Sequence, residues 1–193
     1  MCEYKKMFGM TKVLLLLVIL TVCGCFNSKQ VTFITSVNYN EEVDRTEYLK
    51  FPYGSISMKG KWEKGIFDGN SSQQYFSDAD GVLVSAVLNS IKRYEFNPDG
   101  TKTGMDFLQG YYIWDTDYLI ENSEGLQREV LETDSANNIL IYRLFKDNGS
   151  VNMIMLTAER NGIFMLLTVG SLGDWNEAQA IDFLKDMWMS YKL

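Results

Sequence analysis

Carboxylates are the only side chains that this sequence offers in quantity for acid–base chemistry. It has 25 Asp and Glu, no His and three Cys among 193 residues. Without an imidazole, neither a His-based catalytic triad nor a His metal site can form. A pair of acids about 5–9 Å apart could still hydrolyse a glycosidic bond. Asp115 and Asp117 stand between Trp114 and Tyr118 and are the candidates, although acids that simply face solvent fit the same pattern.

Motifs for nucleophilic, phosphate or metal chemistry are missing or incomplete. The segment 169–173 (VGSLG) lacks the leading glycine of a nucleophile elbow, and the sequence has no phosphate-binding glycine loop. The segments 78–81 (DADG) and 97–100 (NPDG) each contain a fragment of a calcium loop. Neither has the remaining ligands, and both stand where turns are needed. We therefore expect no metal site and no cofactor.

Four aromatic side chains recur at spacings of 4, 3 and 4 residues within a helix predicted from about Thr103 to Ile120. These candidate binding-surface residues are Phe107, Tyr111, Trp114 and Tyr118. A neighbouring apolar face on the same helix could already pack against a sheet. Its members are Met105, Leu108, Tyr112 and Leu119. The combined stripe predicts either a deeply buried helix or an exposed aromatic surface that stacks on sugars or receives a partner.

The N-terminal residues have the pattern of a processed segment. Three lysines precede an apolar run over residues 13–22, which is about half of the roughly 20 residues that span a bilayer. The run ends in Val22-Cys23-Gly24-Cys25, which resembles a bacterial lipobox. We predict that residues 1–24 are a lipoprotein signal peptide, that Cys25 carries the lipid and that residues 25–30 form a short tether. An uncleaved anchor and an ordinary secretory signal are the alternatives.

Charge and cysteine content then describe the mature chain. It would have 15 basic and 24 acidic residues, a net charge of −9, and Cys25 as its one thiol. An acidic chain is unsuited to nucleic acid and to electrostatic docking on anionic lipid, so its membrane contact should come from the acyl chains. We expect a lipid-anchored protein of the bacterial cell envelope with its domain outside the cytoplasm. Phe26, in place of an aspartate after Cys25, favours the outer membrane if the source is Gram-negative.

The pattern of alternation and turns predicts a single α+β domain over residues 31–193. The expected strands are 31–37, 53–58, 73–77, 82–96, 126–132, 138–145, 151–159 and 163–169. Residues 38–47 are expected to form a loop, 59–65 a turn region around Trp62, and 147–149 and 161–162 hairpin turns. A last helix begins at a capping box over 174–177, with Asp174 as the cap. This order predicts an antiparallel sheet meander covered by helices.

Three local segments, together with this order, carry a family resemblance. They are ISMKGKW at 56–62, FSDADGV at 76–82 and FLKDMWMSYK at 183–192. They resemble the Mog1/PsbP-like α/β/α sandwich, including small bacterial lipoproteins grouped with DcrB, over residues 46–193. Gly60-Lys61 stands where that family usually has a proline before the tryptophan. The resemblance implies an accessory module that is not an enzyme, and it transfers no functional residue to this chain.

The functional expectation is therefore a non-catalytic cell-envelope lipoprotein that acts as a binding or assembly module. Its partner would be another envelope protein or a glycan, and nucleic acid is not expected. The alternative is a carboxylate-based hydrolase acting on glycans.

Overall fold

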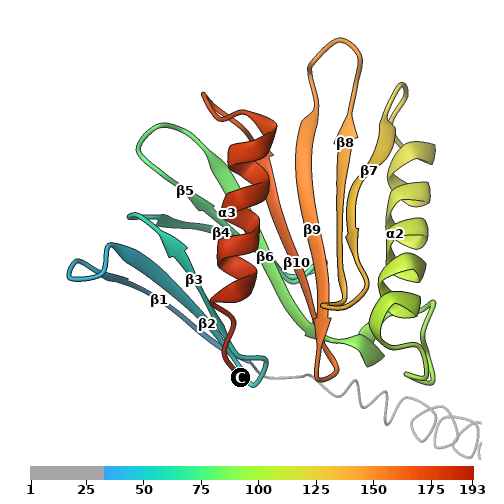
Figure 1. Cartoon of the computed structure of the whole chain (residues 1–193), viewed down its shortest axis with the longest axis horizontal. Coiled ribbons are helices and arrows are strands. Elements are labelled where there is room, and N and C mark those ends of the chain that lie inside the picture. The colour runs from blue at the N-terminus through green and yellow to red at the C-terminus, as the bar shows by residue number, and fades with distance from the viewer. Residues whose placement is uncertain (1–32) are drawn as a thin grey trace, which may run out of the picture. The chain divides into compact units, whose positions relative to one another are not determined.

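The computed structural model describes residues 33–193, which form two antiparallel sheets and two α-helices (Figure 1). The smaller sheet has the order β1-β2-β3, and the larger has the order β4-β5-β6-β10-β9-β8-β7. The strands of the smaller sheet are β1 (Ile34–Asn40), β2 (Arg45–Phe51) and β3 (Ser55–Lys59). Those of the larger are β4 (Glu63–Asp68), β5 (Gln73–Ser77), β6 (Leu83–Ser90), β7 (Gln127–Asp134), β8 (Ile139–Phe145), β9 (Asn152–Arg160) and β10 (Ile163–Ser171). A short 3₁₀ turn, η1 (Ile91–Arg93), precedes the helix α2 (Gly104–Glu121), and the helix α3 (Glu177–Met189) comes last.

The larger sheet buries side chains on both of its faces. On β10, Met165 and Leu167 belong to one hydrophobic cluster and Phe164 and Leu166 to the other. α3 and the smaller sheet contribute to the first cluster, and α2 contributes to the second. This explains why β8 and β10 are apolar at almost every position. The predicted α+β class, an antiparallel meander covered by helices, is confirmed.

The four-strand meander follows the sequence prediction closely. The β9–β10 hairpin turns at Asn161 and Gly162, whose φ angles are 55° and 77°. Positive φ at both central residues is what a tight two-residue hairpin requires, and Asn-Gly tolerates it. The strands on either side pair in continuous register, from Ile163 with Arg160 to Val169 with Ile154.

The first third of the domain contains more strand than predicted. The expected loop over 38–47 is wrong, because β1 runs to Asn40 and β2 begins at Arg45. Tertiary packing overrides the polar composition there: β2 buries every second side chain, including Thr46, Tyr48 and Lys50. The strand expected over 82–96 ends at residue 90, where the Ser90 side chain accepts a hydrogen bond from Lys92 N and caps η1. The first two residues of the expected strand over 31–37 lie outside the described residues.

Both helix starts differ in detail from the prediction. Thr103 is the N-cap of α2, but its side chain makes no capping hydrogen bond; Glu159 instead accepts from the Gly104 amide at 3.0 Å. The cap of α3 is Asn176 and not Asp174. Asn176 Oδ1 accepts from the Gln179 amide at 3.0 Å, and Gln179 Oε1 accepts from the Asn176 amide at 2.9 Å. The capping box is therefore real but begins two residues later.

Candidate functional site

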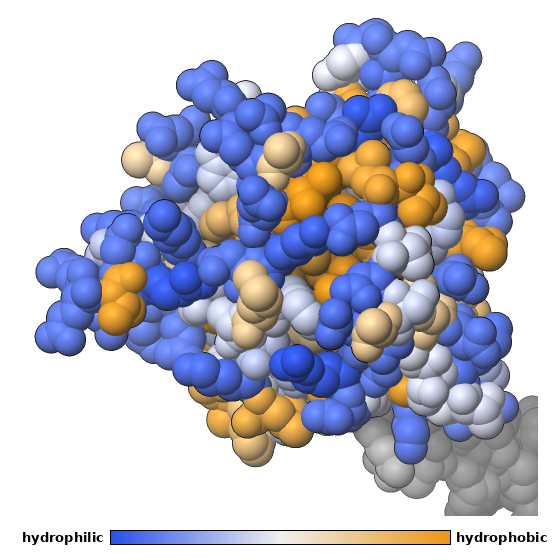
Figure 2. Space-filling view, in the orientation of Figure 1, coloured by the Kyte–Doolittle hydropathy of each residue, from blue (hydrophilic) through white to orange (hydrophobic). Residues whose placement is uncertain are grey.

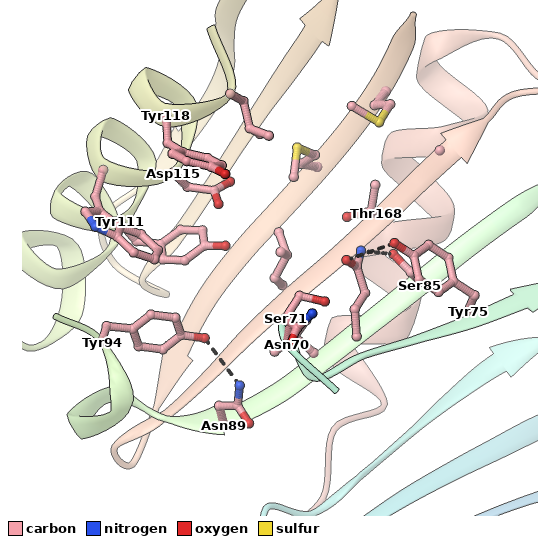
Figure 3. A pocket seen from close by; sticks show the side chains of 18 of the residues that line it. Asn70, Ser71, Tyr75, Ser85, Asn89, Tyr94, Tyr111, Asp115, Tyr118 and Thr168 are labelled. Atoms are coloured by element: carbon pink, nitrogen blue, oxygen red, sulfur yellow. Dashed lines mark hydrogen bonds between the residues drawn. The ribbon is translucent and has the colours of Figure 1, made fainter. Parts of the chain in front are cut away.

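An open cavity of about 600 Å³ lies on the face of the larger sheet that also carries α2. The helix contacts β8 and β9 but leaves part of β5, β6 and β10 uncovered on this face. Residues 93–95, at the end of η1 and just beyond it, and residues 70–71, between β4 and β5, line two further parts of its edge. Figure 3 shows side chains from α2 on one side of this space and side chains from the strands on the other. A helix that covers only part of a seven-stranded sheet thus creates the concave site.

The floor of the cavity consists of strand residues that alternate toward α2. Val87, Met155 and Leu166 supply apolar surface there, and all three are buried. Ser85 and Thr168 supply hydroxyl groups in the same layer. The floor is therefore mostly apolar with a small number of fixed polar atoms, which is typical of sites for small molecules.

Aromatic rings form the wall that belongs to α2 and to the segment after η1. Tyr94 packs edge-on against Tyr111 and Trp114, with ring centroids 5.4 and 6.1 Å apart. Tyr111 and Trp114 lie 6.0 Å apart, and Tyr118 continues the wall one turn further along α2. The packed rings of Tyr94, Tyr111 and Trp114 restrain one another, so this part of the wall is rigid before any ligand arrives.

The predicted aromatic stripe therefore divides into core and surface. Phe107 is fully buried and packs on Phe164 with ring centroids 5.3 Å apart, so it is core and does not line the cavity. Tyr111 is buried but lines the cavity, whereas Trp114 and Tyr118 are 41% and 66% exposed. Three of the four candidate residues thus meet at one concave surface.

Asp115 lies on the cavity side of α2, and its carboxylate points inward beside Tyr118 (Figure 3). Burial raises the pKa of this carboxyl from 3.8 to about 6, and the Tyr111 hydroxyl offsets part of the rise. Asp117 differs, because its carboxylate pairs with Arg128 at 2.5 Å and does not line the cavity. The two acids that the sequence suggested as a pair therefore do not face one site: Asp115 lines the cavity, and Asp117 forms an ion pair outside it.

The opposite wall carries a hydrogen-bonded polar group. Gln73 donates to the Ser85 hydroxyl at 2.5 Å and accepts from the Tyr75 hydroxyl at 3.2 Å (Figure 3). The Thr168 hydroxyl is buried and has no partner among the described residues, although it belongs to the cavity lining. An unpaired buried hydroxyl is costly, so a polar ligand atom at this position would gain a hydrogen bond that the protein alone does not make.

A buried lysine, Lys50, lies behind the lining at one end of the cavity and contacts a lining residue. Lys50 Nζ donates to Asn89 Oδ1 at 3.2 Å and to the Ser72 carbonyl at 3.3 Å. It also lies 4.9, 5.6 and 5.7 Å from three aromatic ring centroids, those of Phe33, Tyr53 and Phe67. Burial, and secondarily the charge of Arg93, lowers the pKa of Lys50 to about 8. Asn89 itself lines the cavity and lies 3.5 Å from the Tyr94 hydroxyl.

Sequence reasoning missed Tyr94, Asn89 and Lys50. The sequence pattern predicts one long strand that includes Asn89 and Tyr94, and it gives no sign of the bend at η1 that turns Tyr94 toward α2. Lys50 lies between the loop predicted over 38–47 and the strand predicted over 53–58, in a segment for which no element is predicted. The one available signal was its spacing from Thr46 and Tyr48, which places all three on one face of a strand.

The opposite face of the larger sheet has a different character. Figure 2 shows hydrophobic residues beside α3, in the region of β8 and β9, with polar side chains crossing them. Arg143 on β8 pairs with Glu129 at 2.9 Å and with Glu177 at 3.2 Å. These pairs are partly exposed and contribute little individually to stability.

Two further properties concern metal ions and membranes. Within residues 33–193, no group of three or more His, Cys, Asp or Glu side chains is arranged to hold a metal ion. None of the helices in that range is long and apolar enough to cross a bilayer. The predicted signal peptide, Cys25 and the tether up to residue 30 lie outside the described residues.

Comparison with known proteins gives a fold and no sequence relative. No protein-family model matches the chain, and no curated protein is similar to it in sequence. The chain is similar to the solution structure of cyanobacterial PsbP (CyanoP) from Synechocystis sp. PCC 6803, with a TM-score of 0.50 and 12% identity. The match covers 89% of this chain and 98% of that one. With its central antiparallel sheet between helical layers, the chain therefore has the Mog1/PsbP-like fold that the sequence resemblance predicted.

Proposed function

We propose that this chain is a non-catalytic, lipid-anchored protein of the bacterial cell envelope whose domain binds a small organic ligand in the cavity beside α2. The observation that carries the proposal is the lining of that cavity: a rigid aromatic wall, an apolar floor and a few polar atoms directed inward. A concave site of about 600 Å³ is of the size that small molecules occupy. The unpaired Thr168 hydroxyl adds a polar position that a ligand could satisfy.

The geometry of the acids favours binding over hydrolysis. A glycosidase needs two carboxylates facing one sugar ring. Asp117, the proposed companion of Asp115, is paired with Arg128 instead, and the other carboxylate of the lining, Glu95, is exposed. The exposed Trp114 and Tyr118 offer a binding protein a surface on which a sugar could stack, so glycans belong among the compounds to be tested.

Binding can be tested with a neutral fluorescent probe, N-phenyl-1-naphthylamine, whose emission rises in apolar surroundings. We expect saturable binding with one probe per chain. Leu83 lies at the rim of the cavity and is 37% exposed, so Leu83→Trp should obstruct the site and weaken binding at least fivefold. Val130→Trp is the matched control, because Val130 is 46% exposed on β7 and does not line the cavity. Equal binding by both variants would refute the cavity as the site.

The anchoring half of the proposal depends on Cys25. If the lipobox interpretation is right, several acyl chains on Cys25 hold the protein at the membrane. Acyl labelling and membrane fractionation of wild type and Cys25→Ser test this directly. We expect the variant to lose both label and membrane association. Cys23→Ser should retain both, since Cys23 precedes the predicted cleavage point.

A further inference from the structure

We propose that the ligand of this cavity is an organic cation, whose ammonium group is held by the Asp115 carboxylate and the aromatic wall around it. The inference rests on the proposed function and names its ligand class. It follows from the charges that face the cavity, from the rings beside Asp115 and from the polar wall opposite.

The charged groups around the cavity are few. α2 contributes Asp115, and the segment after β6 contributes Arg93 and Glu95, both of which are exposed. The strand residues of the lining include no charged side chain within the part of the chain described. Lys50 lies behind the lining, next to Asn89. Asp115 is thus the one charged group of the lining that is partly buried.

Asp115 has no cationic partner in the described range. It takes part in none of the ion pairs found there, and burial raises its pKa although the Tyr111 hydroxyl offsets part of the rise. A carboxylate partly removed from water without a cationic partner is costly, because one hydroxyl replaces only part of the lost hydration. A bound cation would supply the missing charge. Because the charge of Asp115 is negative, a cation is a better match for the cavity than a neutral sugar or an anion.

The surroundings of Asp115 suit an ammonium group in particular. Tyr111, Trp114 and Tyr118 lie before and after it on α2, and Tyr94 packs against the first two. Aromatic faces attract cations, most strongly where water is excluded, and tertiary and quaternary ammonium groups are recognised in this way. The wall therefore combines a carboxylate with several aromatic rings at one end of the cavity.

The rest of the cavity fits the remainder of such a molecule. Beyond the ammonium end, Val87 and Leu166 offer an apolar floor for a hydrocarbon or aromatic body. In Figure 3, Thr168 and Ser85 lie across the cavity from Asp115. A hydroxyl or amide at the far end of the ligand could bond the unpaired Thr168 hydroxyl.

Three compounds of one shape test the inference by calorimetric titration. They are the cation 4-(hydroxymethyl)-N,N,N-trimethylanilinium, its uncharged isostere 4-tert-butylbenzyl alcohol and the anion 4-(hydroxymethyl)benzenesulfonate. At pH 8 we expect the cation to bind at least tenfold more tightly than the isostere and the anion to bind more weakly than either. Asp115→Asn should abolish the preference, whereas Glu95→Gln, which removes the other carboxylate of the lining, should retain it.

Acidification provides an independent readout with the unaltered protein. Protonation of Asp115 below about pH 6 should reduce the affinity for the permanently charged cation while leaving that of the isostere unchanged. Equal binding of cation and isostere at pH 8 would overturn the cation inference but leave a small-molecule site in place. Failure of the fluorescent probe and of all three compounds would overturn the proposed binding function as well.

Discussion

At the scale of single residues, Asp115 and Lys50 are charged side chains held where charge is disfavoured. Neither has an ion-pair partner within residues 33–193. Burial raises the pKa of Asp115 and lowers the pKa of Lys50, so in each case it favours the neutral form of the side chain. Such groups lower the stability of the fold, and they are characteristic of binding sites where function is retained at that cost. Their contributions to stability have opposite dependences on pH, which makes them separately measurable.

Replacement of Asp115 by Asn should stabilise the protein at neutral pH. An acid with a raised folded-state pKa favours folding below its unfolded value, near 3.8, and loses that contribution as pH rises through about 6. A shift of about two units corresponds to at most about 3 kcal/mol, and partial solvent access reduces the expected gain to about 1–2 kcal/mol. Urea unfolding of wild type and Asp115→Asn at pH 7.5 and pH 4 measures this gain. The variant should be more stable than wild type only at pH 7.5.

Asp117→Asn is the matched control for this measurement. Its exposed pair with Arg128 predicts a change of no more than about 1 kcal/mol, in the destabilising direction. A destabilised Asp115→Asn at pH 7.5 would show that the carboxylate has a favourable partner in the folded chain.

Lys50 should make the protein more stable as pH rises above neutrality. Its pKa is lowered on folding to about 8, so the unfolded chain binds more protons between pH 8 and 10.5 and unfolding becomes less favourable across that range. Between pH 7.5 and 9.5 the free energy of unfolding of wild type should rise by about 1–2 kcal/mol relative to Lys50→Met. Parallel pH profiles for the two proteins would contradict the buried-lysine interpretation, whatever their absolute stabilities.

At the scale of elements, local patterns predict the meander and α2 well. Alternation and the Asn161-Gly162 turn are properties of adjacent residues, so they can be read without knowing the fold. The first hairpin and the cap of α2 are different, because they depend on remote partners. The amide of Gly104 is capped by Glu159, 55 residues away, and β2 is a strand because Tyr48 packs on Phe76 across the two sheets.

The division of α2 into a core face and a cavity face predicts unequal effects of truncation. Phe107→Ala removes a fully buried ring and should cost about 3–5 kcal/mol of unfolding free energy. Trp114 is 41% exposed and packs against Tyr94 and Phe96 on one side, so Trp114→Ala should cost about 1–2 kcal/mol. Urea unfolding of both variants checks this. An equally large loss for Trp114→Ala would mean that the ring belongs to the core and is unavailable to a ligand.

At the scale of the whole molecule, the candidate site exists because α2 covers only part of one face of the larger sheet. Sequence periodicity gives each helix and strand a hydrophobic face, but it does not say which part of a sheet a helix covers. α2 covers the β8 and β9 side, while the bend at η1 and residues 70–71 enclose the rest. The aromatic stripe was therefore recognisable from the sequence, whereas Asn89, Thr168 and Ser85, which come from other elements, could be assigned to the site only from the fold.

The stability of the whole domain should be independent of metal ions and of reductant. The two sequence fragments that suggested calcium loops use their oxygens within the protein: Asp78 Oδ1 accepts from the amides of Asp80 and Val82, and Asn97 Oδ1 accepts from the Lys102 amide. A cation would have to displace these hydrogen bonds without the further ligands that calcium requires. For a chain beginning at Phe26, thermal melts with and without chelator, and with and without reductant, should coincide. A loss of several degrees in chelator alone would show that one of these turns holds a metal ion, and substitution of Asp78 or of Asp99 by Asn would then identify which.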